Sequence, residues 1–274
     1  MRATLHNHSI YSDGSKTIKE INEIAIKNGF DVVAITDHDT IDSYLDILDL
    51  DTSVRFIIGV ELSTIYKNEN VHVLGYFSGL NENVIKFFKN MRRERVERCK
   101  KIIDNLREFD GIDISFDEVR KLAHGVVGRP HVAKILSAKL GISVDQAFKK
   151  YIGNYSKSYV PVGKIGTEDA VKFLKENDAI VSLAHPIKIK GFDYKELLKF
   201  GFDAIEVYHP SQNEECSNNL RKVAKDYNLI ITGGSDYHGI NHINRFEQSY
   251  IEGEDLDIFL DKIDGKTSKN KLFR

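Results

Sequence analysis

The chain has 274 residues, 41% of them hydrophobic, which is enough to bury a full core in one large domain or in a main domain with a smaller one. Lysine and arginine total 39 against 41 aspartate and glutamate residues, and the isoelectric point near 6.6 excludes a basic field for long duplex nucleic acid, leaving a small nucleotide or short oligonucleotide as a possible partner. Two cysteines cannot build a disulfide framework. The sequence has no apolar signal-peptide core and no apolar run of about 18 residues, which predicts a cytoplasmic protein with no membrane partner. No obligatory protein partner is evident from the sequence.

Short apolar runs rich in β-branched residues recur along the chain, and segments of helical character follow several of them. This alternation predicts an α/β fold in which parallel strands joined by helices close into a barrel. An open doubly wound sheet is the alternative, since strand number alone does not separate the two. We favour the barrel because strands with candidate ligands come from both ends of the sequence. The seven predicted strands are 2–5, 32–36, 56–60, 71–77, 179–184, 204–208 and 229–232.

Roughly ninety residues without a convincing strand separate the fourth and fifth predicted strands, too many for an ordinary connection. Residues 83–109 keep apolar side chains at near-helical spacing, which predicts a long amphipathic helix whose charge run from Arg92 to Lys101 faces solvent. Shorter helices are predicted at 116–122, 129–140 and 144–151. We therefore expect residues 1–82 to form the first part of the barrel, 83–164 a helical insertion domain that caps the substrate, and 165–274 the second part of the barrel.

The first fourteen residues have a spacing typical of metal ligands. In an extended strand His6 and His8 point to the same side, about 6 to 7 Å apart, with Asn7 turned away. Asp13 follows after a short turn. Taken alone, a His-X-His motif near a terminus is more often a pair of exposed polar residues than a metal site, because short motifs match often by chance.

Further ionisable residues follow the predicted strands at the end where barrel enzymes carry their chemistry. Each has an ordinary structural explanation, such as a buried hydrogen bond for His185 or a helix cap for Asp37. Together they favour a metal site, since histidines and carboxylates hold zinc, manganese or iron where thiolates are absent. His72 is an exception because it lies at the start of its predicted strand, and His124 and His242 are expected to be surface or structural residues. The residues at the expected end are His6, His8, Asp13, His38, Glu61, His185, Asp236 and His238.

The motifs around these residues resemble those of the PHP (polymerase and histidinol phosphatase) family of metal-dependent phosphoesterases over nearly the whole chain. The similar segments are 6–9 with 12–14, 36–39, 59–61 with 72–76, 184–186 and 233–239. The resemblance implies a distorted seven-stranded barrel and two to three divalent metal ions, and it places His72 among the ligands. The implied ligand sets are His6, His8, Glu61 and Asp236 for one ion, Glu61, His72 and His185 for a second, and Asp13, His38 and His238 for a third.

Segments 128–133, 146–148 and 159–161 of the insertion are similar to the PHP subgroup that hydrolyses 3′,5′-nucleoside bisphosphates and short 5′-phosphorylated oligonucleotides, called RNase AM in some members. Arg129 suits a phosphate because its planar guanidinium binds oxygens bidentately and the N–H groups of a helix start favour anions. On motif grounds alone, Arg129 and His131 would be a surface arginine and a helix-terminal histidine. With the resemblance, we expect both to bind the substrate.

The resemblance implies hydrolysis of the 3′-phosphate of a 3′,5′-nucleoside bisphosphate by a metal-bridging hydroxide. Manganese, zinc or iron ions that share Glu61, one of them also held by Asp236, would lower the pKa of the bridging water, and Arg129 would neutralise phosphoryl charge. His209, also at a strand end, could protonate the leaving group or bind a phosphate, and a structural role is equally open. The alternatives are a phosphomonoesterase of the histidinol phosphate type, a non-catalytic metal-binding or nucleotide-binding module, and a scaffold whose insertion docks a partner protein.

Overall fold

The computed structural model describes residues 1–123, 125–161, 165–239 and 243–266, so that His124 and His242 lie outside the described residues. The strands are β1 (Arg2–Thr4), β2 (Val32–Ile35), β3 (Arg55–Tyr66), β4 (Glu69–Phe77), β5 (Ile165–Gly166), β6 (Ile180–Leu183), β7 (Ala204–Tyr208), β8 (Ile230–Gly233) and β9 (Ile251–Glu252). Around them lie α1 (Ile18–Lys27), α2 (Tyr44–Leu48), α7 (Thr167–Glu176), α8 (Glu214–Asp226) and α9 (Glu254–Asp264), with the short helices η2 (Pro186–Lys188) and η3 (Tyr194–Phe200).

Within the described residues, the strands form one sheet in the order β8-β7-β6-β4-β3-β2-β1-β9, with β5 added beside β3. The two sides of this sheet come together through the residues that follow β1 and β8. The backbone N–H of Leu5 donates to the carbonyl of Gly233 at 2.9 Å, and that of Asp236 donates to the carbonyl of His6 at 2.9 Å. Gly234 permits this approach, because a Cβ there would lie 2.3 Å from the backbone nitrogen of His6. The predicted α/β barrel is confirmed, and its closure brings the first fourteen residues against residues 233–238.

Strand β4 departs from the expected parallel arrangement. It pairs antiparallel with both β3 and β6, and a tight turn joins it to β3. The turn residues Lys67 and Asn68 both have positive φ, 48° and 65°, as a two-residue hairpin requires. Because β4 runs against its neighbours, its first residues lie at the same end of the barrel as the last residues of the parallel strands. His72, opposite Ser63 of β3, therefore reaches the expected site from the start of its strand.

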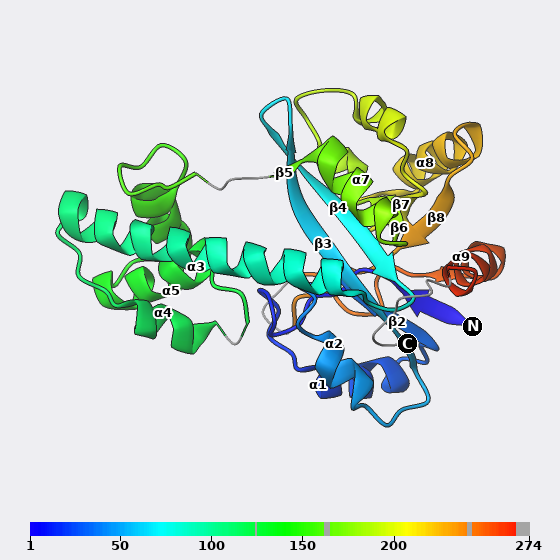
Figure 1. The fold of residues 1–274 in the computed structure, drawn as a ribbon, viewed down its shortest axis with the longest axis horizontal. Helices are drawn as coiled ribbons and strands as arrows, with labels where there is room; N and C mark the ends of the chain where they lie inside the picture. Colours follow the sequence, from blue (N-terminus) through cyan, green and yellow to red (C-terminus); the bar gives the residue numbers. More distant parts are fainter. Residues whose placement is uncertain (124, 162–164, 240–242, 267–274) are drawn as a thin grey trace.

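The segment between β4 and β5 folds into helices that lie to one side of the barrel in Figure 1. These helices have a hydrophobic core of their own. Buried residues of that core include Cys99, Val119, Leu136 and Ile152. The expected helix at 144–151 is divided into an α-helix and a π-helix, and the expected domain boundary after 164 lies beside residues 162–164, outside the described residues. The helices are α3 (Glu82–Asp110), α4 (Phe116–Leu122), α5 (Arg129–Leu140), α6 (Val144–Ala147) and η1 (Phe148–Ile152).

The long helix α3 spans the barrel and the insertion, and the expectation that its charge run faces solvent is wrong in part. Arg93 is exposed, but Arg95 and Arg98 are only partly exposed and turn towards the barrel. Arg95 forms an ion pair with the buried carboxylate of Asp39. The insertion thus rests on loops of the barrel rim. Among the described residues, no helix has the length and apolar character needed to cross a membrane.

Candidate metal centre

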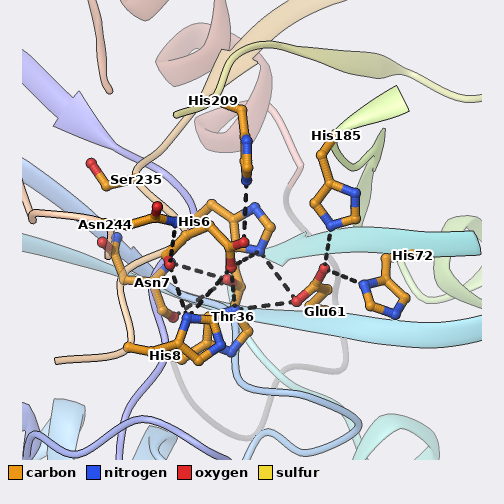
Figure 2. Close-up of polar contacts among 12 residues, drawn as sticks. His6, Asn7, His8, Thr36, Glu61, His72, His185, His209, Ser235 and Asn244 are labelled. Atoms are coloured by element: carbon orange, nitrogen blue, oxygen red, sulfur yellow. Dashed lines mark hydrogen bonds and ion pairs between the residues drawn. The ribbon is translucent and has the colours of Figure 1, made fainter. Parts of the chain in front are cut away.

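Glu61 of β3 is the centre of a cluster of imidazole rings at the barrel rim, shown in Figure 2. Its carboxylate is 1% exposed. Oε1 lies 2.7 Å from His72 Nδ1 and 2.9 Å from His185 Nε2. The other oxygen, Oε2, lies within 3.2 Å of a ring nitrogen of each of three further histidines, His6, His8 and His38. Five imidazoles therefore converge on one carboxylate.

Two aspartates extend the cluster on either side of Glu61. Asp236 Oδ1 lies 3.2 Å from His8 Nε2, and Asp13 Oδ1 lies 3.3 Å from His238 Nε2. The rim thus brings together the sequence-predicted ligands. Three sets of ligand atoms lie mutually within 4.8 Å: His6, His8, Glu61 and Asp236; His38, Glu61 and His72; and His8, Asp13, His38 and His238.

These sets can be compared with those that the resemblance implies. The first is the same. In the second, His38 stands where His185 was expected, although His185 contacts the same oxygen of Glu61 as His72 does. The third gains His8. The antiparallel β4 explains why the place of His72 could not be found from strand ends alone.

The donor atoms of the cluster fit a divalent cation. His6 Nε2, His8 Nε2, His38 Nδ1 and Glu61 Oε2 are buried and make no hydrogen bond with any of the described residues. Buried polar atoms without a partner are rare and costly in folded proteins. A metal cation is a partner that imidazole nitrogens and a carboxylate oxygen can share, and such a set without thiolates suits zinc, manganese or iron.

The electrostatics of the rim also favour added positive charge. Burial alone would raise the pKa of Glu61, but His38, His72 and His6 outweigh it and hold that pKa well below its usual range. For His8, burial lowers the pKa, yet the nearby carboxylates of Asp236 and Glu61 raise it to about 10. The carboxylates therefore stay ionised, and protons on His8 and His6, whose pKa is also raised, take the place that a metal ion would fill.

Two other histidines of the cluster stay neutral. Burial lowers the pKa of His38 to about 3 and that of His185 to about 4, against the opposing effect of Glu61. A neutral imidazole has one nitrogen with a free lone pair, and this neutral form is the one that binds metal. The rings of His38 and His185 are thus in the neutral form that binds metal at neutral pH.

A buried glutamate that sequence reasoning missed supports the cluster from behind. Glu206 of β7 is 0% exposed, its Oε1 lies 2.9 Å from His6 Nδ1, and its Oε2 accepts the backbone N–H of His185 at 2.7 Å. Carboxylates that hold the second nitrogen of a histidine ligand fix its ring orientation. The sequence signal for Glu206 was its position within the apolar strand 204–208, because a carboxylate buried in such a strand needs a polar partner.

The loop with Asp13 is fixed by a second buried carboxylate. Asp37 accepts hydrogen bonds from the backbone N–H of Ser9 at 2.7 Å and from the hydroxyls of Ser9 and Ser12 at 2.6 Å. Residues at the rim also adopt strained backbone conformations, with φ of 26° at His185 and 48° at Asp236. Such strain is typical of functional sites, where the surrounding structure holds it.

The metal centre opens into a cavity of about 270 Å³ whose opposite wall belongs to the insertion. Asp13, His38 and His72 line the barrel side. Arg95, Arg98, Arg129 and His131 line the insertion side. The expected substrate residues Arg129 and His131 therefore face the expected metal ligands, whereas His209 lies 3% exposed beside Asp236 and does not line this cavity.

Arg129 is held in position by the end of the insertion. Its Nη1 donates to Asn154 Oδ1 at 3.0 Å and to the carbonyl of Ile152 at 3.2 Å, and its guanidinium lies 4.9 Å from the ring centre of Phe148. His131 Nδ1 accepts the backbone N–H of Gly128 at 3.2 Å. Burial lowers the pKa of His131, so its neutral ring carries a proton on Nε2 that can be donated to a ligand.

The cationic wall has more charge than its carboxylates neutralise. Burial and the charge of Arg98 lower the pKa of Arg95 to about 10, and burial and Arg129 lower the pKa of Arg98. Within the part of the chain that the structure describes, Arg98 Nη2 is buried without a hydrogen bond, and of the three arginines Arg95 has the ion pair with Asp39. Sequence reasoning missed Arg95 and Arg98 because it placed them on the solvated face of α3. A multiply charged anion is the ligand that these guanidinium groups suit.

Comparisons with known proteins agree with this arrangement. The family model of the PHP domain matches residues 4–199. The chain is 29% identical over 265 residues to a 5′-3′ exoribonuclease of Haemophilus influenzae, covering 93% of this chain and 94% of that protein. It is 27% identical over 246 residues to a 3′,5′-nucleoside bisphosphate phosphatase of Chromobacterium violaceum, covering 85% and 86%. A crystal structure from Bifidobacterium adolescentis, described as a metal-dependent phosphoesterase, superposes with a TM-score of 0.80 at 25% identity over 95% of this chain and 96% of that one.

Proposed function

The chain belongs to the PHP domain family and is a metal-dependent phosphoesterase, and we propose that it removes the 3′-phosphate of a 3′,5′-nucleoside bisphosphate. The observation that carries this proposal is the cavity with metal ligands on one wall and Arg95, Arg98 and Arg129 on the other. A substrate with two phosphates has one anionic group for each wall of the cavity. One phosphate would lie at the metal centre, and the other would neutralise the arginines.

We propose that the rim holds two to three divalent ions of manganese, zinc or iron. Glu61 is shared between sites, because each of its oxygens faces a different group of histidines. When bound, such ions make hydroxide available from water near neutral pH and withdraw charge from phosphoryl oxygens. The ligands of the first ion are His6, His8, Glu61 and Asp236, and the remaining rim residues His38, His72, His185, Asp13 and His238 complete the other sites.

The insertion residues orient the substrate. Arg129 and Arg98 donate to the 5′-phosphate, and the Nε2–H of His131 adds a neutral donor at the start of α5. Binding energy at this remote phosphate positions the reacting one, which lowers the barrier for the 3′-phosphate.

Short oligonucleotides with a 5′-phosphate are a second proposed substrate class. The Haemophilus influenzae relative is named for exonuclease activity from the 5′ end. An oligonucleotide with a 5′-phosphate presents the same remote phosphate to Arg129 and the same first phosphoester to the metal centre. A substrate of the histidinol phosphate type has one phosphate and would leave the arginine wall without a partner.

The test compares phosphate release from adenosine 3′,5′-bisphosphate, 3′-AMP and histidinol phosphate by protein loaded with Mn²⁺ or Zn²⁺. We expect adenosine 3′,5′-bisphosphate to have the highest kcat/KM, about tenfold to a hundredfold above 3′-AMP, which is the effect of losing one charge-assisted phosphate contact. Preference for histidinol phosphate, or equal rates for the bisphosphate and 3′-AMP, would overturn the proposed substrate.

A further inference from the structure

We propose that Lys188 and His209 are a positioning pair that fixes the carboxylate of Asp236, an inference that rests on the proposed function in taking Asp236 as a metal ligand. Lys188 is the last residue of η2, three residues after His185. Its Nζ lies 3.2 Å from Asp236 Oδ2, and His209 Nε2 lies 3.2 Å from the same oxygen. Two side chains, one from η2 and one from the residue after β7, thus meet on one oxygen atom.

The contacts of His209 define which of its nitrogens carries the proton. The backbone N–H of Ser211, which can only donate, lies 3.0 Å from His209 Nδ1, and the Ser211 hydroxyl lies 2.8 Å from the same nitrogen. Nδ1 is therefore an acceptor, and the ring proton is on Nε2, directed at Asp236. Lys188 Nζ is also a donor, so its 3.4 Å contact with His209 Nε2 is no hydrogen bond. Both groups donate to Asp236 Oδ2.

The two oxygens of Asp236 consequently make different contacts. Oδ1 faces the metal centre, 3.2 Å from His8 Nε2 and 3.5 Å from His6 Nε2, while Oδ2 is held from outside. The backbone of Asp236 is held in the left-handed region, with φ of 48°. The two donors restrict the remaining freedom, which is the rotation of the Asp236 side chain. Groups that hold a metal ligand in this way typically change metal affinity tenfold to a hundredfold when removed.

This geometry assigns His209 to positioning, since its Nε2 proton is already donated to Asp236. Lys188 reaches the cluster from the surface, with 42% of its side chain exposed. Replacing Lys188 therefore opens no cavity in the core. Lys190, exposed and two residues further on, offers a matched control on the same loop.

The experiment measures Mn²⁺ binding to the full chain by titration, with the variants Lys188→Met, Lys188→Arg, His209→Gln and Lys190→Met. We expect Lys188→Met to raise the dissociation constant of one ion by about tenfold to a hundredfold. Lys188→Arg, which keeps a donor, should stay close to wild type, and Lys190→Met should be unchanged. The double variant Lys188→Met/His209→Gln should be non-additive, because both residues act through one oxygen.

A second measurement separates positioning from direct substrate contact. At saturating Mn²⁺ the kcat/KM of Lys188→Met should recover towards wild type, because excess metal compensates for weaker binding. Unchanged Mn²⁺ affinity in Lys188→Met would overturn the inference, and so would a raised KM that persists at saturating Mn²⁺. The metal titration needs no substrate, so failure to hydrolyse a nucleoside bisphosphate would count against the proposed function and not against this inference.

Discussion

The barrel rim and the insertion face each other across one cavity with opposite chemistry. On the rim, five imidazoles surround the buried carboxylate of Glu61, His38 and His185 among them in the neutral form, and the charge of Glu61 favours added positive charge. On the insertion, Arg98 and Arg129 bring positive charge that few carboxylates neutralise. The difference indicates a division of work in which the rim holds cations for the reaction and the insertion holds an anionic part of the substrate.

The two regions also differ in how they are built. Rim residues sit at strand ends that the closed barrel fixes from both ends of the sequence, with buried supports such as Glu206. Insertion residues sit on helices that contact the rim through a few links, including the ion pair of Arg95 with Asp39. Changes at the rim should therefore affect metal binding and rate, and changes in the insertion should affect substrate selection.

The largest effect is expected from Glu61→Gln. Glu61 faces five imidazoles, so loss of its charge should remove metal and lower kcat/KM by about a thousandfold or more. Metal content by elemental analysis and phosphate release are the two measurements. Glu69→Gln, an exposed residue of β4, is the control and should behave as wild type. Full metal content in Glu61→Gln would break the proposed sharing of Glu61 between ions.

The next effect is expected from arginine replacement in the insertion. Arg129→Ala should raise KM for adenosine 3′,5′-bisphosphate by about tenfold to a hundredfold through loss of a charge-assisted phosphate contact. Its metal content should not change, and its activity on 3′-AMP should change little. Lys134→Ala, exposed on the same helix, is the matched control. If Arg129→Ala harms both substrates equally, the division between rim and insertion is wrong.

A smaller effect concerns the pH dependence of metal binding. In the metal-free protein, burial lowers the pKa of His8 but the nearby carboxylates of Asp236 and Glu61 raise it to about 10. Metal must then displace a proton at neutral pH, so affinity should increase with pH by about tenfold per unit for each displaced proton, up to the raised pKa. Calorimetry in buffers of different ionisation enthalpy counts these protons. An affinity that stays constant from about pH 7 to pH 9 would contradict the charge balance described for the rim.

The smallest effect is expected from replacing a helix-capping residue in either region. Thr17 caps α1 in the barrel and Ser115 caps α4 in the insertion, each through a reciprocal pair of hydrogen bonds with the glutamate three residues later. Thr17→Ala and Ser115→Ala should each lower the free energy of unfolding by about 1 kcal/mol in urea denaturation. Ser115→Ala should keep full metal content. Loss of metal in Ser115→Ala would show that the insertion supports the rim more closely than its contacts indicate.

Much of the rim could be predicted from sequence because parallel strands bring their carboxyl ends together. His6, His38 and Asp236 follow from this rule with no knowledge of side-chain contacts. His72 did not follow, because β4 is antiparallel and its turn, Lys67-Asn68, is a hairpin that strand periodicity alone does not reveal. Only the family resemblance placed His72 among the ligands.

Other parts of the site depend on tertiary packing and were out of reach. Arg95 and Arg98 lie on the polar side of an amphipathic helix, which ordinarily faces solvent. They line the cavity because the insertion folds back against the rim, a long-range contact that no local pattern indicates. The pairs between β1 and β9 and between β3 and β5 span two residues each, too short for a periodic signal.

The most direct test of the division between rim and insertion is a crystal structure of the Mn²⁺-loaded chain with adenosine 3′,5′-bisphosphate. Anomalous scattering locates the manganese ions. We expect ions around residue 61, the 3′-phosphate beside them, and the 5′-phosphate against Arg98 and Arg129. Both phosphates at the ions, or a nucleotide that makes no contact with these arginines, would contradict the account.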